Sequence, residues 1–260
     1  MSSGQVHPTA LVQPGARLAP DVAVGAYSII GEQVEVGAGT WIGSHVVIEG
    51  RTRIGHNNRI FQFASIGAPP QDKKYGGEDT AVEIGDDNTF REYVTINRGT
   101  ARDAGVTRVG DGNWLMAYVH VAHDCQVGSH ATFANFCGLA GHVSVGDWAI
   151  LGGATLVHQF VQLGAHSFTG MGAYLARDLP PYVKAAGNMA KPYGINSEGL
   201  RRRGFSVDTI ARIKRAYRTL YRSGLGLEEA KRELAAQADQ CAEVGTLLEF
   251  LTRSQRGLIR

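Results

Sequence analysis

An aliphatic residue occupies every sixth position of the stretch VGAYSIIGEQVEVGAGTWIGSHVVI, residues 24–48. The same spacing extends to both sides, at Val6, Val12, Leu18, Val24, Ile30, Val36, Ile42, Ile48, Ile54, Ile60 and Ile66. It returns at Ile84, Phe90 and Ile96, then shifts by one residue and continues from Val109 to Leu175 with only Thr169 off type. A period of six fits neither an α-helix nor a long alternating strand. It suits a solenoid in which each six-residue side gives one strand and one corner.

Three of these sides make one coil of about 18 residues, and stacked coils bury their aliphatic residues in a continuous column. The sequence therefore predicts a mainly β protein in which residues 1–180 form a parallel β-helix. The 34 glycines of the chain fit this fold. Glycine often follows the aliphatic residue, as at Gly25, Gly31 and Gly37, where we expect it to let a strand turn a corner.

Two polar stretches interrupt the repeat. Residues 68–82 read APPQDKKYGGEDTAV, and residues 98–108 read RGTARDAGVTR. Both contain the glycine, proline or charged residues typical of loops, so we expect them to leave the coils as excursions. Long loops on a regular solenoid are more often functional than not, although an exposed charged loop is the simpler alternative.

The repeat stops at Pro180 and Pro181, and residues 181–260 are predicted to form a small C-terminal α-helical domain. Ser206–Ser223 has an N-cap serine and apolar residues at helical spacing, and two more helices are expected near residues 227–238 and 244–254. This tail holds 15 basic and 8 acidic residues, against 11 and 16 in residues 1–180. It is therefore a basic module, suited to an acidic partner or a phosphate-bearing ligand, or simply a solvated helical surface.

Composition limits the remaining possibilities. A net charge of only +2 argues against a general nucleic-acid binder. The three cysteines, Cys125, Cys137 and Cys241, have neither the even number of a disulfide framework nor the spacing of a thiolate zinc site. No signal sequence and no apolar run long enough to span a bilayer is present. We therefore expect a cytoplasmic protein without stable membrane insertion.

A cluster of histidines falls on one strip of the predicted prism. Positions 18 residues apart lie above one another, so His123, Gly141 and Gln159 should stack, with His120, His142 and His158 nearby. A corner histidine can take a proton from a hydroxyl near neutral pH, and the unhindered Gly141 N–H could hold a developing oxyanion. Two alternatives remain: solenoid corners that merely tolerate histidine, and a zinc site formed by His120, His123 and His142 with help from a neighbouring subunit.

Several motifs extend this interpretation along the whole chain: AYVHVAHDCQVG, GLAGHVSVGDWAILGG, VHQF, QFASIG followed by QDKKY, PPYV, INSEGLRRRGF and the terminal RGLIR. Through them the chain resembles the family of UDP-N-acetylglucosamine 3-O-acyltransferases, hexapeptide-repeat enzymes that begin lipid A synthesis. The resemblance implies that the β-helix is left-handed, although parallel crossovers are ordinarily right-handed. A related N-acyltransferase family carries an extra N-terminal uridine-binding domain, whereas the repeats here begin at Val6.

The resemblance also implies a mechanism. His123 would act as general base on the glucosamine 3-hydroxyl, which attacks the thioester of a 3-hydroxyacyl chain on acyl carrier protein. Gly141 would donate its N–H to the oxyanion, and Asp124 would support the imidazole. No cofactor, metal or covalent intermediate is implied.

Binding roles are carried over in the same way. The resemblance assigns substrate binding to Gln71, Asp72, Lys74, His120, His142, His158, Gln159, Asn196, Glu198, Arg202 and Arg203. The first three would hold the sugar, the histidines and Gln159 would line the cleft, and the last four would bind the uridine diphosphate. The basic tail would dock the acidic acyl carrier protein.

Met171 stands where family members that transfer longer chains have glycine, so it would act as a ruler that limits the acyl chain to about 10 carbons.

We expect a homotrimer with clefts between neighbouring β-helices, because one subunit could not enclose a site built from loops and corners. The sequence leaves open a 3-amino acceptor, a coenzyme A donor, a zinc-dependent γ-type carbonic anhydrase and an inactive scaffold.

Overall fold

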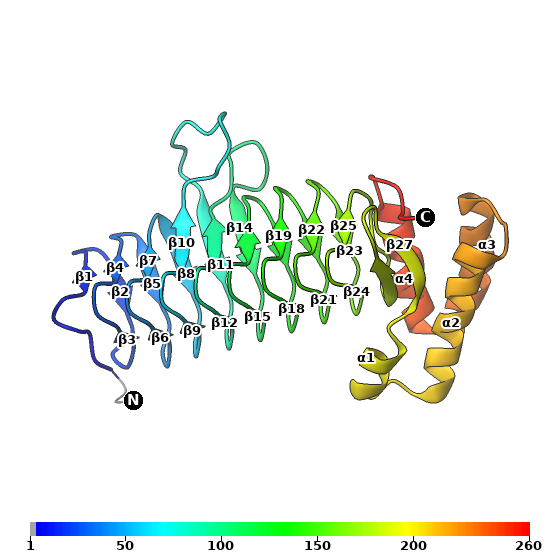
Figure 1. Ribbon diagram of the computed structural model, residues 1–260, viewed down its shortest axis with the longest axis horizontal. Coiled ribbons are helices and arrows are strands. Elements are labelled where there is room, and N and C mark those ends of the chain that lie inside the picture. The colour runs from blue at the N-terminus through cyan, green and yellow to red at the C-terminus, as the bar shows by residue number, and fades with distance from the viewer. Residues whose placement is uncertain (1–3) are drawn as a thin grey trace.

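Stacked coils form a long triangular prism with a helical unit at one end (Figure 1). The computed structural model describes residues 4–260. Three parallel sheets make the faces of the prism, and each coil contributes one short strand to each sheet. The fold is the predicted left-handed parallel β-helix followed by a small helical region. Within residues 4–260, no helix is both long enough and apolar enough to cross a membrane.

We call the three faces sheets I, II and III. Sheet I contains β1 (Leu11–Val12), β4 (Ile29–Ile30), β7 (Val47–Ile48), β10 (Ser65–Ala68), β13 (Thr95–Asn97), β16 (His120–Val121), β19 (Gly138–Leu139), β22 (Leu156–Val157) and β25 (Tyr174–Leu175). Sheet II contains β2 (Arg17–Leu18), β5 (Val34–Val36), β8 (Arg51–Ile54), β11 (Ala81–Ile84), β14 (Val106–Val109), β17 (Gln126–Val127), β20 (Ser144–Val145) and β23 (Gln162–Leu163). Sheet III contains β3 (Ala23–Val24), β6 (Trp41–Ile42), β9 (Arg59–Ile60), β12 (Thr89–Phe90), β15 (Trp114–Leu115), β18 (Thr132–Phe133), β21 (Ile150–Leu151), β24 (Phe168–Thr169), β26 (Val183–Ala186) and β27 (Lys191–Ile195).

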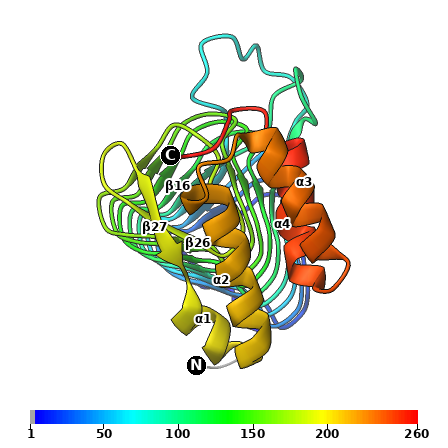
Figure 2. The same ribbon diagram turned by 90° about the vertical axis from the view of Figure 1, so that its right-hand side faces the viewer.

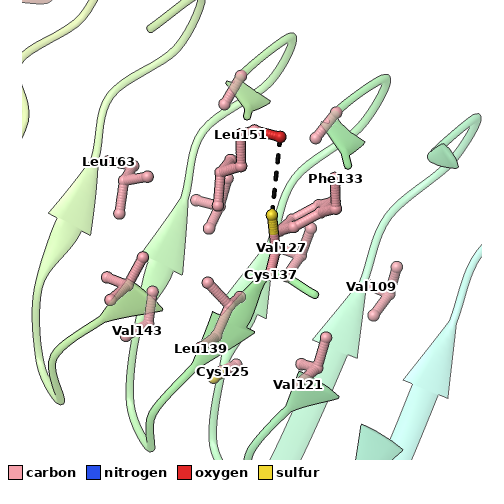
Figure 3. Packing of buried hydrophobic residues seen from close by; sticks show 14 of the residues in the cluster. Val109, Val121, Cys125, Val127, Phe133, Cys137, Leu139, Val143, Leu151 and Leu163 are labelled. Atoms are coloured by element: carbon pink, nitrogen blue, oxygen red, sulfur yellow. Dashed lines mark hydrogen bonds between the residues drawn. The ribbon is translucent and has the colours of Figure 1, made fainter. Parts of the chain in front are cut away.

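The aliphatic residue of each hexapeptide points into the prism, as the spacing predicts. Phe133, Leu139 and Leu151 are fully buried and stack along the interior (Figure 3). Even Thr169 is buried, because its hydroxyl bonds with that of Thr155 at 2.8 Å. The exception is the first coil, where Val6 remains 44% exposed because no coil covers it from the N-terminal side. The hydrophobic column thus accounts for most of the core.

Glycine has a different role at the corners from the one we expected. The corner residue with positive φ comes three positions after the aliphatic residue and is rarely glycine: Tyr27 has a φ of 59° and Asp124 a φ of 60°. The glycine directly after the aliphatic residue is needed because successive coils approach closely. A Cβ on Gly25 would lie 2.6 Å from the carbonyl carbon of Gly43 in the next coil. Spacing between coils, rather than corner conformation, requires this glycine.

Three buried asparagines form a ladder between coils inside the prism. The amide and side-chain Nδ2 of Asn88 both donate to Asn58 Oδ1 at 3.0 Å. Asn88 Oδ1 in turn accepts from the amide of Asn113 at 2.8 Å. Each side chain therefore satisfies backbone groups that the corners would otherwise bury without partners.

Both expected loops leave the prism at the same edge. Residues 69–80 connect β10 to β11, and residues 98–105 connect β13 to β14, so each loop replaces a corner between sheets I and II. They project side by side from the upper rim of the coils (Figure 1). We call these segments the first loop and the second loop, and the rim between sheets I and II the I/II edge. Both loops are shorter than predicted because their ends join strands.

The β-structure continues beyond residue 180. After the two prolines, β26 pairs in parallel with β24, and β27 pairs antiparallel with β26. Sheet III therefore extends to Ile195. The hexapeptide pattern does not continue into β26, whose residues alternate between buried and half-buried with a period of two.

Helices close the C-terminal end of the prism (Figure 2). They are α1 (Ser197–Arg202), α2 (Val207–Arg222), α3 (Leu227–Ala238) and α4 (Ala242–Arg253). The three predicted helices are confirmed, and Ser206 caps α2 by accepting from the Thr209 amide at 3.0 Å. The short α1 was not predicted. Buried Asp178 joins the two parts, because its carboxylate accepts from the Ser254 hydroxyl at 2.6 Å.

Candidate active site

His123 and Asp124 form a hydrogen-bonded pair at the I/II edge. In a strand, adjacent side chains point to opposite faces, but these two residues form a corner and Asp124 has a φ of 60°. This left-handed conformation turns the carboxylate toward its neighbour, and His123 Nδ1 lies 2.9 Å from Asp124 Oδ2. The Asp124 side chain is fully buried, whereas His123 keeps 16% of its side chain exposed. The imidazole is therefore held by a buried carboxylate at Nδ1, while part of the ring stays accessible to solvent.

The second loop donates further hydrogen bonds to the Asp124 carboxylate. Thr100 donates its amide to Oδ1 at 3.0 Å and its hydroxyl to Oδ2 at 2.7 Å. The amide of Asp124 itself donates to the Thr107 hydroxyl at 2.8 Å. The Asp124 carboxylate is therefore bonded to the second loop on one side and lies against His123 Nδ1 on the other.

Gly141 lies one coil further along, against the face of the His123 ring. A Cβ at this position would lie 2.5 Å from His123 Cε1 and 2.6 Å from Nε2, so only glycine leaves room for the imidazole. Within residues 4–260, no acceptor receives the Gly141 N–H. The Gly141 N–H is therefore an unused donor near His123 Nε2, as an oxyanion site requires.

His142 completes the cluster. Its Nδ1 lies 2.6 Å from Asp103 Oδ2 of the second loop, and its Nε2 lies 3.9 Å from Asp124 Oδ2. Its ring stacks on Phe160 and meets His123 edge to face, with centroids 4.3 and 5.0 Å apart. Sequence reasoning placed His142 in the cleft but missed both Asp103 and Thr100. Counting coils could have placed their loop at the I/II edge, because Ile66, Ile96 and Val121 are paired positions in successive strands of sheet I.

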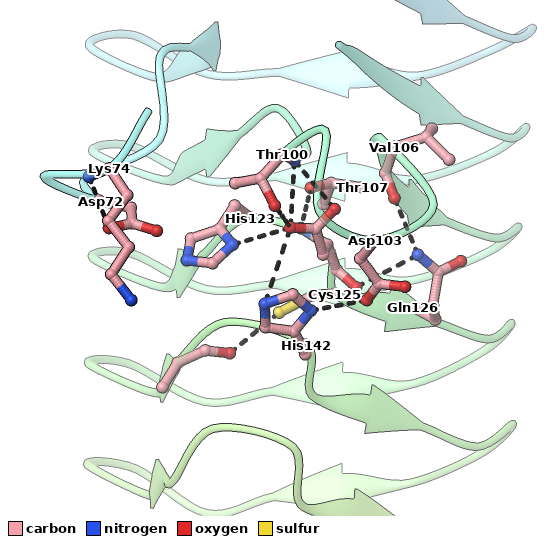
Figure 4. Close-up of polar contacts among 12 residues, drawn as sticks. Asp72, Lys74, Thr100, Asp103, Val106, Thr107, His123, Cys125, Gln126 and His142 are labelled. Atoms are coloured by element: carbon pink, nitrogen blue, oxygen red, sulfur yellow. Dashed lines mark hydrogen bonds and ion pairs between the residues drawn. The ribbon is translucent and has the colours of Figure 1, made fainter. Parts of the chain in front are cut away.

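The first loop lies on the other side of His123. In Figure 4, Asp72 and Lys74 face His123 from the side opposite the second loop. The pKa of Asp72 is below its ordinary value, chiefly because its carboxylate accepts the Lys74 amide, and the nearby charges of His123 and Arg102 add to this. Gln71 of the same loop is exposed. The two loops thus stand on either side of the corner.

The remaining residues expected to line a cleft lie along sheet I and its rim. His120 projects outward from β16 and bonds with the Thr95 hydroxyl through Nδ1 at 2.7 Å. Burial lowers the pKa of His120, and His123 nearby lowers it further. His158 and the exposed Gln159 belong to the coil after that of Gly141, two coils from His123, and His158 Nδ1 donates to the Gln159 carbonyl at 3.2 Å. The predicted stack of positions 123, 141 and 159 is present, since backbone bonds join the three corners.

The four residues expected to bind the nucleotide lie at a different rim, between sheets II and III. Asn196 caps α1 and donates to the His166 carbonyl at 3.1 Å. Arg203 reaches His166 Nδ1 at 3.3 Å and lies over the Trp148 ring. Glu198 is paired with Arg202 at 3.1 Å, and Arg202 is exposed. A single chain therefore does not bring these residues to His123.

Met171 lies at the third rim, between sheets III and I, and 84% of it is exposed. Its methyl group would lie 3.8 Å from a Cβ on Gly153 of the preceding coil. Between Met171 and His123, sheet I presents the side chains of Leu156 and Tyr174 outward. The path between the proposed base and the proposed ruler is therefore the outer face of sheet I.

Metal-ligand geometry favours a group other than the three histidines considered from the sequence. Among residues 4–260, the side chains whose ligand atoms lie within 4.8 Å of one another are His123, Asp124 and His142. His120 is not part of this group. In the present arrangement, Nδ1 of His123 and Nδ1 of His142 each lie against a carboxylate oxygen rather than toward a shared metal position.

Coils of six-residue sides place the protein in the hexapeptide-repeat class. A model of the bacterial transferase hexapeptide matches residues 107–141, and a model of the second domain of UDP-N-acetylglucosamine O-acyltransferase matches residues 178–259. The chain belongs to the family of UDP-N-acetylglucosamine O-acyltransferases.

Relatives of known name match over the whole chain. The acyl-(acyl-carrier-protein)--UDP-N-acetylglucosamine O-acyltransferase of Thiobacillus denitrificans is 58% identical over 255 residues, covering 98% of this chain and 99% of that protein. The solved structure of LpxA from Acinetobacter baumannii is 46% identical with a TM-score of 0.96, covering 98% of this chain and 99% of that one. The UDP-N-acetylglucosamine O-acyltransferase of Moraxella catarrhalis is 45% identical with a TM-score of 0.96 and the same coverage.

Proposed function

We propose that this protein transfers a 3-hydroxyacyl chain from acyl carrier protein to the 3-hydroxyl of UDP-N-acetylglucosamine, in lipid A biosynthesis. The observation that carries the proposal is the buried Asp124 carboxylate 2.9 Å from His123 Nδ1. With Nδ1 held in this way, Nε2 is left as the basic atom that faces the open side of the corner. The names and extent of the relatives support the choice of substrates.

The reaction follows from this geometry. His123 Nε2 takes the proton of the sugar hydroxyl as its oxygen attacks the thioester carbonyl, and Asp124 stabilises the imidazolium that forms. The Gly141 N–H donates to the oxyanion of the tetrahedral intermediate. Collapse of this intermediate breaks the carbon–sulfur bond, and the imidazolium returns the proton to the departing thiolate. The residues need no covalent intermediate and no cofactor for these steps.

Substrate positions are part of the same proposal. Asp72 and Lys74, with Gln71, would hold the sugar beside His123, because the first loop faces the imidazole (Figure 4). His120, His142, His158 and Gln159 would line the cleft. The acyl chain would follow the outer face of sheet I toward Met171. Asn196, Glu198, Arg202 and Arg203 would bind the uridine diphosphate, because guanidinium groups can grip phosphate oxygens in pairs.

A homotrimer would complete this site. The nucleotide-binding residues lie at one rim and His123 at another, so a neighbouring copy would have to bring them together. Sedimentation of the purified protein at three times the mass of its 27.9 kDa chain would support the trimer, and a monomer with full activity would exclude it.

The basic helical tail would dock acyl carrier protein. A cytoplasmic location also belongs to the proposal, because the three cysteines are unpaired thiols.

The decisive experiment combines the protein with UDP-N-acetylglucosamine and 3-hydroxyacyl-acyl carrier protein. We expect acyl transfer by the wild type and a loss of at least about 100-fold for His123→Ala, because general-base catalysis contributes about that much. Coenzyme A thioesters and carbon dioxide with zinc test the alternative activities. His45→Ala is the matched control, because this corner histidine stacks on Tyr27 and Phe63, several coils from His123. Acyl transfer that survives His123→Ala would exclude His123 as the base.

A further inference from the structure

The second loop is fixed to the active site at its base. Thr100 donates both its amide and its hydroxyl to the buried Asp124 carboxylate. Gly99 has no space for a side chain, because a Cβ would lie 2.8 Å from Asp124 Oδ1 and even closer to the backbone of Gly105 and Val106. The start of the loop therefore has a defined position relative to His123, and the residues that follow it extend toward the next coil.

Asp103 is the residue of the second loop that contacts His142. Its Oδ2 accepts from His142 Nδ1 at 2.6 Å, across 39 positions of sequence (Figure 4). The other sides of the His142 ring are also occupied, by the parallel Phe160 ring and the edge-on His123 ring. The backbone amide of His142 is bonded to the His123 carbonyl at 3.0 Å. Only the region around Nε2 is left without a hydrogen-bond partner among residues 4–260.

The site therefore contains two histidine–carboxylate pairs built in the same way. His123 has Asp124 at Nδ1, and His142 has Asp103 at Nδ1. In each pair the carboxylate selects the tautomer with the proton on Nδ1 and leaves Nε2 without a hydrogen-bond partner among residues 4–260, although Nε2 of His142 lies 3.9 Å from Asp124 Oδ2. Asp124 is common to both pairs, because it bonds His123 directly and anchors the loop that carries Asp103.

We propose that Asp103 is a positioning residue for the sugar nucleotide, acting through His142. By accepting the Nδ1 proton it fixes the ring orientation in which His142 Nε2 meets a hydroxyl of the acceptor. The acceptor is favoured over the acyl donor because the two loops flank His123, one on each side, and the first of them is the proposed sugar-binding loop. The charge of Arg102, next to Asp103, acts on Asp72 of the proposed sugar-binding loop. This inference rests on the proposed function.

Steady-state kinetics of Asp103→Asn and Asp103→Ala test the inference. The Asp103 side chain is half exposed, so we expect a modest effect: a rise of about fivefold in KM for UDP-N-acetylglucosamine. The kcat and the KM for acyl-acyl carrier protein should stay within about twofold of wild type, because an interaction made equally in ground and transition states changes only KM. Asp21→Asn is the matched control, since this exposed carboxylate accepts from the Gly39 amide at 3.0 Å in the N-terminal coils, away from both loops.

A double-mutant cycle separates positioning from simple loop stability. In a His142→Gln background, Asp103→Asn should raise KM by less than about twofold, because its target is already gone. Equal rises in both backgrounds, or an unchanged KM in the single variants, would overturn the inference. An inactive wild type would instead refute the proposed function, so the two failures are distinguishable.

Discussion

At the scale of single residues, the corner conformation decides the chemistry. Asp124 combines a positive φ with full burial, so its carboxylate reaches both His123 and the second loop. The same corner position in the next coil holds His142, with a φ of 63°. Successive left-handed corners thus bring both Asp124 and His142 against the His123 ring, Asp124 at Nδ1 and His142 edge to face. The site depends on this repeated backbone geometry as much as on residue type.

Gly141→Ala tests how closely the corners are fitted. A methyl group there would lie 2.5 Å from His123 Cε1, so the imidazole would have to move. The substitution keeps the Gly141 N–H, so any loss reports displacement of the base rather than loss of the oxyanion donor. We expect kcat to fall by about 100-fold, as for a misplacement of about 1 Å. The measurement is steady-state kinetics together with a thermal melt.

The control for this variant is Gly153→Ala, at a comparable corner of the rim between sheets III and I. Its nearest contact would be Asn135 O at 3.5 Å, an ordinary distance. The control should retain activity. If Gly141→Ala keeps kcat within tenfold of wild type, the ring of His123 is not confined as described.

Residue types and spacing could predict the positions of His123, the proposed base, and of the glycine one coil further along, but not the hydrogen bonds that hold His123. His123 and Gly141 follow from an 18-residue coil. The pairing of His123 with Asp124 runs against strand alternation and depends on one backbone angle. Asp103 lies 39 positions from its partner, inside a loop whose path no periodicity describes. Contacts made by excursions from the repeat therefore need the structure.

At the scale of elements, the repeat sets where each excursion emerges. Both loops replace corners of the I/II edge, one and two coils before the corner of His123. Hydrogen bonds then hold the second loop against that corner. Three elements far apart in the chain are thus combined at one rim, because a solenoid stacks equivalent positions.

The asparagine ladder predicts a stability effect without a catalytic one. Asn88→Ala would leave the buried Asn113 amide without its acceptor and remove a donor from Asn58 Oδ1. An unsatisfied buried group costs about 1–3 kcal/mol, so we expect a lower Tm with normal kcat for the folded protein. Asn135→Ala is the control, because this residue is exposed. A Tm equal to that of the control would show that the ladder contributes nothing.

The contact between α1 and the β-helix predicts a pH effect on stability. Burial and the Arg203 guanidinium lower the pKa of His166 to about 4, below its ordinary value near 6.5. The unfolded chain therefore binds this proton first, and stability is full above about pH 6.5 and falls as the pH drops toward 4. Because His166 is only partly buried, we expect the loss to be on the order of 1 kcal/mol.

Urea unfolding at about pH 7 and about pH 5 measures this effect, with His166→Gln as the test variant. The difference in unfolding free energy between the two pH values should shrink in the variant. His45→Gln leaves the contact with Arg203 intact and should keep the wild-type difference. An unchanged pH dependence in His166→Gln would contradict the assignment.

At the scale of the whole molecule, one chain presents the parts of the proposed site on three different rims. His123 lies at the I/II edge, Arg203 at the rim between sheets II and III, and Met171 at the rim between sheets III and I. An exposed methionine cannot limit the length of a chain unless another surface covers it. Three copies around an axis, each placing one rim against a face of the next, would enclose all these residues. The exposure of Met171 is thus an argument for assembly.

Met171→Gly tests the proposed ruler and, through it, the path of the acyl chain along sheet I. Removing the thioether opens the end of the groove, so we expect the preferred donor to lengthen from about 10 to about 14 carbons, since each methylene changes binding measurably. Competition between 3-hydroxyacyl donors of different length on acyl carrier protein measures the preference directly. Met171→Leu keeps the bulk and should keep the wild-type preference. An unchanged preference in Met171→Gly would place the end of the acyl chain elsewhere.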